Sequence, residues 1–313
     1  MEPAASPWWQ RWWRRSPAAP PVAPALATPA ELRFGPYRAT GVLGHGASGP
    51  VYLAQLDGPP SGAPQVAIKA LALDPSLAQA EQASQRQRFL RQAEVLRSLS
   101  HPDIIAVLDT GERGGEPWLA MELAPGTDLS RYTRKQRLLP EALVLRIAAR
   151  VARALAHAHE HGVVHRDLKP ANVRIDLGSD RLKLVDFGVA RVQDAEVTRT
   201  GVTLGTPAYM APEQLTGEPA DARTDTYALG VMLYELLTGR LPFPATNLGE
   251  LLRAVASGEP APLRHWQAHL PVGLETLIGQ ILQRAPGLRP QNLPALAAEL
   301  ERWATLLQQT PRA

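Results

Sequence analysis

Several features that often define a protein's chemistry are missing from this chain of 313 residues. It contains no cysteine, which excludes disulfides, thiolate zinc sites and cysteine nucleophiles and is compatible with a reducing compartment. It has no apolar run of about eighteen residues, so no membrane-spanning helix is expected, and its N-terminus lacks the apolar stretch of a secretory signal. The net charge of only +3 gives no sign of a nucleic-acid-binding surface. Composition predicts a soluble, cytoplasmic protein and leaves its chemistry open.

The N-terminal segment, residues 1–33, is rich in proline and alanine, and this composition predicts a disordered tail. The tail contains a Trp/Arg cluster at residues 8–15 that holds more than half of the chain's tryptophans. Indoles at the lipid headgroups and arginines on anionic lipid would make a peripheral anchor at the inner membrane surface. The alternatives are a docking peptide and an end without a role, because the tryptophans would cover only part of a helical face.

The remaining chain, residues 34–307, changes from strand patterns to helical patterns. Short apolar or alternating runs with glycine and proline between them predict strands at 42–43, 51–54, 66–68 and 117–123. Residues 79–98 have apolar side chains at helical spacing, and most segments beyond residue 128 do as well. This order predicts an α+β fold in two lobes, the first at 34–122, a connection at about 122–127, and the second at 128–307.

The first chemical signal is the run Gly44-His45-Gly46-Ala47-Ser48-Gly49. A dinucleotide-binding fold would need a helix to begin at the third glycine, but Pro50 and the strand-like run 51–53 follow instead. A hairpin tip without side chains allows backbone N–H groups to approach phosphate oxygens closely. The run is therefore a candidate phosphate-binding hairpin, and an ordinary surface turn is the equal alternative.

The second signal is a lysine, Lys69, at the end of the predicted strand Val66-Ala67-Ile68. If its side chain points inward, its ammonium needs a partner, because an unpaired buried charge is costly. Phosphate oxygens would supply that partner. A solvated lysine at a sheet edge is the simpler alternative.

The third signal is His165-Arg166-Asp167-Leu168-Lys169-Pro170-Ala171-Asn172, followed by Asp186-Phe187-Gly188. These residues supply what phosphoryl transfer requires. Asp167 can orient a hydroxyl group and accept its proton, and Lys169 can neutralise charge on the moving phosphoryl group. Asn172 and Asp186 offer the hard oxygen ligands that suit Mg²⁺, and Mn²⁺ could take its place.

These motifs together resemble the eukaryotic-type (Hanks-type) protein kinase family in its bacterial Ser/Thr branch, over residues 37–303. Gly205 to Glu213 resembles the end of the family's activation segment, Asp225 the brace of its catalytic loop, and Arg289 the partner of Glu213. The resemblance implies transfer of the ATP γ-phosphate to serine or threonine hydroxyls of protein substrates. It also implies ATP-binding roles for Leu43, Gly44, Gly46, Gly49, Val51, Ala67, Lys69, Met121, Glu122, Leu123 and Asp128, with Met121 as gatekeeper and Glu122 and Leu123 meeting adenine through backbone groups.

Two positions depart from the family pattern. The glutamate of the family's αC helix is replaced by Gln92, so its pair with Lys69 becomes a neutral amide contact. Glu94 lies nearly on the opposite helical face and cannot take its place. This departure leaves open a catalytically weak or inactive pseudokinase scaffold. Arg174 stands where the family packs an aliphatic side chain beneath adenine, and we expect its stem to cover the ring while its guanidinium reaches solvent.

The segment between Asp186 and Glu213 contains Thr198-Arg199-Thr200, which resembles the paired threonines that bacterial kinases autophosphorylate. We expect Arg88, Arg166 and Arg191 to receive the phosphates, which would order the segment and partly offset the missing αC carboxylate. The alternative is that the arginines are solvated and the threonines are polar loop residues.

Overall fold

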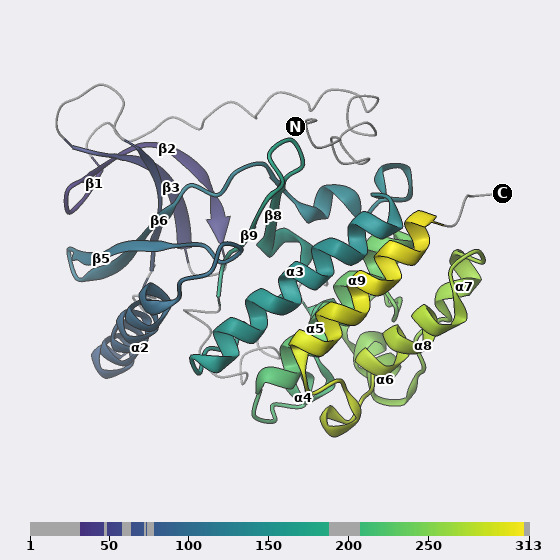
Figure 1. The fold of residues 1–313 in the computed structure, drawn as a ribbon. Helices are drawn as coiled ribbons and strands as arrows, with labels where there is room; N and C mark the ends of the chain where they lie inside the picture. The colour runs from purple at the N-terminus through teal and green to yellow at the C-terminus, as the bar shows by residue number, and fades with distance from the viewer. Residues whose placement is uncertain are drawn as a thin grey trace, which may run out of the picture. The chain divides into compact units, whose positions relative to one another are not determined.

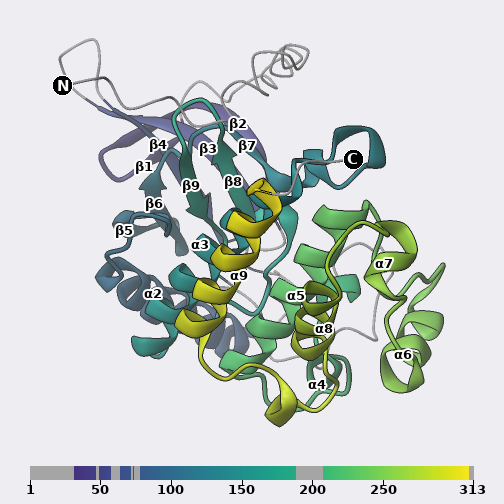
Figure 2. The ribbon, with the colours of Figure 1, turned by 45° about the vertical axis from the view of Figure 1, so that its right-hand side comes forward.

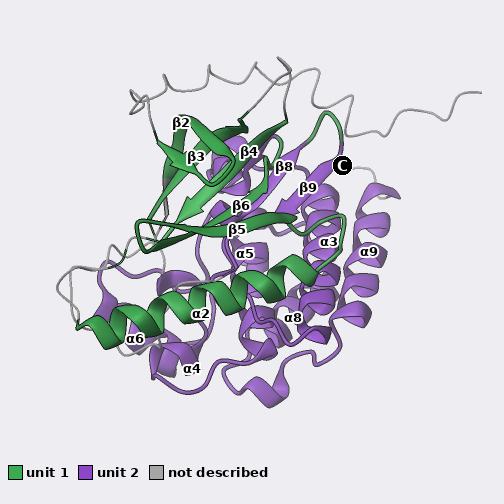
Figure 3. Ribbon diagram, turned by 90° about the vertical axis from the view of Figure 1, so that its left-hand side faces the viewer, with its two compact units in different colours: residues 1–125, 177–179, 189–192 green, residues 126–176, 180–188, 193–313 purple. Residues whose placement is uncertain are grey.

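The computed structural model describes residues 32–46, 49–57, 64–71, 73, 78–187 and 207–309, and these residues form two compact units. The first unit consists mainly of the described residues up to Pro125 and is named the strand-rich unit below (Figure 3). The second, from Gly126 onward, is named the helical unit. Strands come first and helices second, which confirms the predicted α+β class. No helix among the described residues is both long and apolar enough to cross a bilayer.

The strand-rich unit is built on one antiparallel sheet of six strands in the order β1-β2-β3-β4-β6-β5 (Figure 1). A helix, α2, connects β4 to β5 and packs against β5 and β6. The elements are β1 (Arg33–Phe34), β2 (Tyr37–Gly46), β3 (Gly49–Leu56), β4 (Gln65–Ala70), α2 (Gln79–Ser98), β5 (Val107–Arg113) and β6 (Glu116–Glu122).

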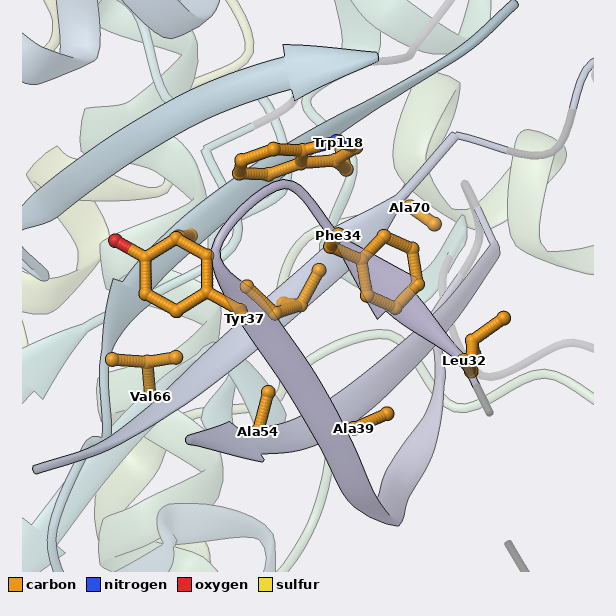
Figure 4. Packing of buried hydrophobic residues seen from close by; sticks show 10 residues of the cluster. Leu32, Phe34, Tyr37, Ala39, Ala54, Val66, Ala70 and Trp118 are labelled. Carbon is orange, nitrogen blue, oxygen red and sulfur yellow. The ribbon is translucent and has the colours of Figure 1, made fainter. Parts of the chain in front are cut away.

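The two faces of this sheet carry different side chains because successive residues of a strand point to opposite sides. On one face an aromatic cluster forms around Phe34, Tyr37 and Trp118, with Val66, Ile68 and Ala70 of β4 in the same buried group (Figure 4). Ala67 and Lys69 alternate with those β4 residues and therefore point to the other face. Separately, α2 buries Phe89, Ala93 and Leu96, and its Arg86 makes two hydrogen bonds of 2.7 and 2.6 Å to the Glu112 carboxylate on β5.

The helical unit combines a small sheet with a helical core (Figure 2). Its three strands have the order β7-β8-β9, and the longest helices are α3, α5 and α9. The elements are β7 (Thr127–Asp128), η1 (Leu129–Tyr132), η2 (Lys135–Arg137), α3 (Glu141–Glu160), η3 (Pro170–Asn172), β8 (Val173–Asp176), β9 (Arg181–Leu184), η4 (Pro207–Tyr209), α4 (Pro212–Leu215), α5 (Ala222–Thr238), α6 (Leu248–Ser257), α7 (Leu263–Trp266), α8 (Val272–Ile281), η5 (Pro286–Leu288) and α9 (Leu293–Gln309).

Helix α5 lies at the centre of the helical unit and is apolar on almost every side, as expected of a helix that is surrounded by others. It packs against α3 and α8, while α9 runs along α3 (Figures 1 and 2). Gly230 permits the contact with α8, since a Cβ at this position would lie only 2.5 Å from the Ile281 side chain. Helix α5 begins at a side-chain cap, Asp221, and ends at Gly239, whose φ of 72° suits glycine. This buried helix is the rigid element that positions the candidate site.

Candidate active site

The loop between α3 and β8 brings together three of the predicted site residues. The Lys169 ammonium lies 2.9 Å from Oδ2 of Asp167. The Asn172 amide donates to the Asp167 backbone carbonyl at 2.8 Å and to the same Oδ2 at 3.2 Å. Asp167 is only partly buried, so its carboxylate can still meet a substrate. A carboxylate held by an ammonium and an amide in this way is a positioned proton acceptor.

Asp225, on the first turn of α5, fixes the backbone of this loop. Its carboxylate is fully buried and accepts hydrogen bonds of 2.8 Å from the backbone N–H groups of His165 and Arg166. The His159 ring lies at 2.8 Å from the same carboxylate. Arg166 has a φ of 63°, a left-handed conformation that is uncommon for a residue with a side chain. The hydrogen bonds that Asp225 accepts from the loop backbone therefore stabilise the left-handed conformation of Arg166.

The His165 side chain connects the loop to the strand that leads to Asp186. Its Nε2 lies 3.0 Å from the Val185 carbonyl, and its ring packs 4.6 Å from the Phe187 ring. Complete burial lowers the pKa of His165, so the ring is neutral near pH 7. The residue is therefore a structural connection and not a charged group of the site.

Asn172 and Asp186 are drawn together by a backbone bond, in which Val185 N–H donates to the Asn172 carbonyl at 2.9 Å. Because Nδ2 of Asn172 is directed at Asp167, its Oδ1 faces away from that residue and can act as a ligand. An amide oxygen and a carboxylate fit a hard cation such as Mg²⁺, which commonly takes one or two protein ligands and completes its shell with water and phosphate. The described residues contain no cluster of three or more His, Asp or Glu side chains suited to a metal.

A buried ion pair anchors α4 beneath this region. Arg289 binds Glu213 through both terminal nitrogens, at 2.7 and 2.8 Å. Its remaining N–H groups donate to the backbone carbonyls of Gln283, Arg284 and Arg223, so all five donors of the guanidinium are used. Burial by itself would raise the pKa of Glu213, but the hydrogen bonds and charge of Arg289, with hydrogen bonds from the backbone and from Thr224, together outweigh it and keep that pKa below its ordinary value. The predicted pairing of these two residues is present in the structure.

In the strand-rich unit, four predicted nucleotide-binding residues share one face of the sheet. Val51 of β3 lies directly opposite Lys69 of β4, and Ala67 lies opposite Met121 of β6. Directly opposed side chains point to the same side, and residues two apart on β4 do as well. Lys69 is only 5% exposed. Residues that are separate in the sequence therefore line one surface, the face opposite the aromatic cluster.

The glycine-rich run forms the hairpin between β2 and β3. Gly44 pairs with Val51, and Gly46 pairs with Gly49 at the end of the hairpin. Gly49 has a φ of 134°, which residues with a Cβ rarely adopt. Leu43 is about half exposed beside this pair. Strand β3 follows directly, as the sequence predicts for a phosphate-binding hairpin.

Two of the residues with predicted ATP-binding roles, Glu122 and Asp128, have partners of their own. The Glu122 carboxylate accepts a bond of 2.8 Å from Ala106 N–H, and the Glu122 N–H donates to the Ala106 carbonyl at 3.0 Å. The N–H of Glu122 is therefore not available to a nucleotide base. Leu123 follows it directly and is half-buried. Asp128 uses one carboxylate oxygen to cap η1 through Ser130.

The two departures from the family pattern are both visible. Gln92 is half-buried on α2, and within the described part of the chain no hydrogen bond joins its side chain to Lys69. The guanidinium of Arg174 does not simply reach solvent as the sequence suggests: it donates to the Gly126 carbonyl, and its Nε is buried. Backbone carbonyls at a tight glycine turn attract such a donor, and no sequence pattern indicates this.

The predicted regulatory residues are only partly within the described ranges. Arg88 on α2 and Arg166 beside Asp167 are both exposed. Arg191, Thr198 and Thr200 lie outside the described residues, as do Gly188 and the N-terminal Trp/Arg cluster. Sequence reasoning missed His159 and Gln214, which bind Asp225 and the Arg166 carbonyl respectively. Their partners lie 66 and 48 positions away, so no local signal could have found them.

Comparisons with known proteins agree with this geometry. The model of the protein kinase domain family matches residues 37–300. The chain is 41% identical over 276 residues to the serine/threonine-protein kinase PkaB of Streptomyces coelicolor, covering 84% of this chain and 63% of PkaB. It is 36% identical over 274 residues to Pkn2 of Myxococcus xanthus, and 33% identical over 272 residues to PrkC of Bacillus subtilis, both also named serine/threonine-protein kinases. Each alignment covers 85% of this chain, with 32% of Pkn2 and 40% of PrkC.

The chain thus spans from about a third to just under two thirds of the length of these relatives. The match with the family model nevertheless covers most of this chain, including the hairpin, Lys69, the catalytic loop and the Glu213–Arg289 pair. Members of this family use ATP and a divalent metal ion. The prediction made from the motifs is confirmed: the chain belongs to the protein kinase domain family.

Proposed function

We propose that this chain transfers the γ-phosphate of ATP to serine and threonine hydroxyls of other proteins, with Mg²⁺ or, in its place, Mn²⁺. The observation that carries the proposal is the positioned carboxylate of Asp167, held by Lys169 and Asn172 within hydrogen-bonding distance. Relatives that share the catalytic loop region are named serine/threonine-protein kinases. We also propose a cytoplasmic location, where ATP is available.

Each group has a distinct task in this proposal. Asp167 orients the acceptor hydroxyl and takes its proton, while Lys169 stabilises negative charge on the transferred group. Asn172 and Asp186 would hold the metal ion, which neutralises phosphate charge when it is bound. Lys69 and the glycine hairpin would hold the phosphates through an ammonium and backbone N–H groups. Positioning and charge stabilisation account for most catalysis in this type of reaction.

The remaining predicted contacts would hold the nucleoside part of ATP. We propose that Leu43, Val51, Ala67 and Met121 pack against the adenine, and that Leu123 meets it through its backbone. The free carboxylate oxygen of Asp128 would accept from a ribose hydroxyl.

The test compares the purified wild type with Asp167→Asn, using labelled ATP and a generic protein substrate. Asp167→Asn should abolish transfer and leave ATP binding nearly unchanged, because Asp167 acts on the hydroxyl and not on the nucleotide. A wild type that binds ATP and transfers nothing under any metal would identify a pseudokinase scaffold. Retention of most activity in Asp167→Asn would show that the catalytic loop is wrongly assigned.

We further propose that phosphorylation of Thr198 and Thr200 activates the enzyme, with Arg88, Arg166 and Arg191 as receivers of the phosphates. Three guanidiniums around a dianion would make charge-assisted hydrogen bonds that order the segment. After phosphatase treatment, wild type given ATP should show a lag and then acceleration, and the Thr198→Ala/Thr200→Ala variant should not. Identical time courses without phosphate on either threonine would contradict this proposal. The Trp/Arg cluster at residues 8–15 stays a proposed membrane or docking contact.

A further inference from the structure

Arg174 occupies an unusual position in the small sheet of the helical unit. Its neighbours on β8, Val173 and Ile175, are buried at 0% and 2% exposure, so Arg174 points to the opposite side. In register it lies directly between Asp128 of β7 and Lys183 of β9. Two cations side by side on one face repel each other. The pairing with Lys183 disfavours an arginine here and the pairing with Asp128 favours it, so cross-strand pairing alone does not account for Arg174.

The Arg174 guanidinium is directed at the point where the helical unit begins. One terminal nitrogen donates to the carbonyl of Gly126, the first residue of that unit. Gly126 has a φ of 68°, and a Cβ at this position would lie 2.0 Å from the Ile175 carbonyl oxygen. No other residue type fits such a close approach to β8 without displacement. The turn at Gly126 therefore lies close against the backbone of β8, and its carbonyl accepts a hydrogen bond from Arg174.

The carboxylate that lies opposite Arg174 does not form an ion pair with it. Asp128, its cross-strand neighbour, is bonded to Ser130, and within the described part of the chain Arg174 makes no ion pair. The Nε of Arg174 is buried without an acceptor among the described residues. A buried donor that lacks an acceptor is costly, and such atoms are rare in native proteins. Both facts indicate that this side chain is retained for a role other than ion pairing.

We propose that Arg174 is a positioning residue of the nucleotide site, which clamps the Gly126 carbonyl and so fixes the segment 126–128 that carries Asp128. This inference rests on the proposed function, in which Asp128 meets the ribose and Asn172, two residues before Arg174, meets the metal. The clamp sets the separation of these two contacts along the nucleotide. Loss of the guanidinium therefore weakens nucleotide binding and leaves phosphoryl transfer from bound nucleotide intact.

The informative variant is Arg174→Met, which keeps an unbranched apolar stem and removes the guanidinium. We expect the KM for ATP and the calorimetric Kd for ATP to rise about tenfold, as for loss of one good hydrogen bond to a charged group. We expect kcat to change by less than about twofold, since none of the groups that act on the hydroxyl is altered. Arg174→Lys, which keeps the charge and donors on a single nitrogen, should fall between the wild type and Arg174→Met.

The matched control is Arg181→Met, which removes an exposed guanidinium from the same β8–β9 hairpin. It should leave KM, kcat and Kd at wild-type values. Amide hydrogen exchange of the nucleotide-free protein provides a readout that needs no activity. Exchange at residues 126–130 should be faster in Arg174→Met than in wild type or Arg181→Met, and exchange in α9 should be unchanged in all three.

The outcomes separate this inference from the proposed function. A wild type that does not transfer phosphate would refute the proposed function, while faster exchange at 126–130 in Arg174→Met would still support the clamp. Unchanged exchange together with unchanged nucleotide Kd would overturn the clamp even in an active kinase. A fall in kcat at constant KM would also overturn it, because Arg174 would then act in transfer. Equally faster amide exchange throughout the helical unit of Arg174→Met would also overturn the clamp, because Arg174 would then only contribute to the overall stability of that unit.

Discussion

The Glu213–Arg289 pair gives the sharpest test of how the helical unit is held together. Arg289→Ala would leave the Glu213 carboxylate buried without its cation and would remove the donors to three backbone carbonyls. Removing one partner of a buried ion pair typically costs about 3–5 kcal/mol. This is a large share of the roughly 5–15 kcal/mol by which native proteins are stable. We therefore expect Arg289→Ala to be severely destabilised.

Arg153→Ala is the control, because it breaks an Arg–Glu ion pair that is exposed and not buried. The Arg153–Glu301 pair has a separation of 2.6 Å, but its side chains are 41% and 48% exposed. An exposed pair contributes only about 0–1 kcal/mol, since water screens it. Both substitutions thus remove an arginine from a glutamate partner. The burial of the Arg289 pair, together with its three backbone acceptors, separates their expected effects.

The assay is urea unfolding followed by far-UV circular dichroism, with the m-value checked in each variant. A double variant, Glu213→Gln/Arg289→Met, should recover part of the loss of Arg289→Ala, because it leaves no uncompensated charge. Equal stability changes in Arg289→Ala and Arg153→Ala would refute the reasoning. So would a double variant that is less stable than Arg289→Ala, since the penalty would then not come from a stranded carboxylate.

Three further predictions concern the pH dependence, the loop brace and α2. The hydrogen bonds of Glu213 and the charge of Arg289 together hold the pKa of folded Glu213 below its ordinary value of 4.5. The stabilisation from Glu213 is therefore present above about pH 4.5 and is lost as the pH falls through the folded pKa, and Glu213→Gln should flatten this acid limb in urea titrations from pH 3 to 7. Asp225→Asn should lower kcat about tenfold or more while circular dichroism stays native, and unchanged kcat would contradict the brace. Gln92→Glu should raise the transfer rate about tenfold through a charge-assisted bond to Lys69, and an unchanged rate would show that Lys69 is held in another way.

Much of the fold followed from local patterns. The helix at 79–98 was predicted at its observed bounds, because its buried residues Phe89, Ala93 and Leu96 repeat at helical spacing. The change from strands to helices was also visible in the sequence. The strand β5 was not predicted, since its run Val-Leu-Asp-Thr-Gly-Glu-Arg does not alternate apolar and polar residues. Its pairing with β6, and not its own sequence, makes it a strand.

The chemical residues were also apparent in the sequence, because phosphoryl transfer requires a few residue types at short spacing. Asp167, Lys169 and Asn172 lie within six positions of one another, so a single loop can bring them together. By contrast, Lys69, Val51 and Met121 could be assigned to one site only through a family resemblance. The sheet register places them on one face, and register depends on pairing between distant segments.

Only the tertiary structure shows the contacts that position the candidate site residues. The His159–Asp225 bond and the Arg174 bond to Gly126 join residues 66 and 48 positions apart. The propensities and periodicities of a single sequence describe local structure over a few residues. They do not indicate which distant backbone carbonyl will accept a hydrogen bond from a given side chain. The sequence by itself therefore determined the family and the groups to which we assign the proposed reaction. The folded chain decided how those groups are oriented, since buried polar groups take whichever partner the packing brings within reach.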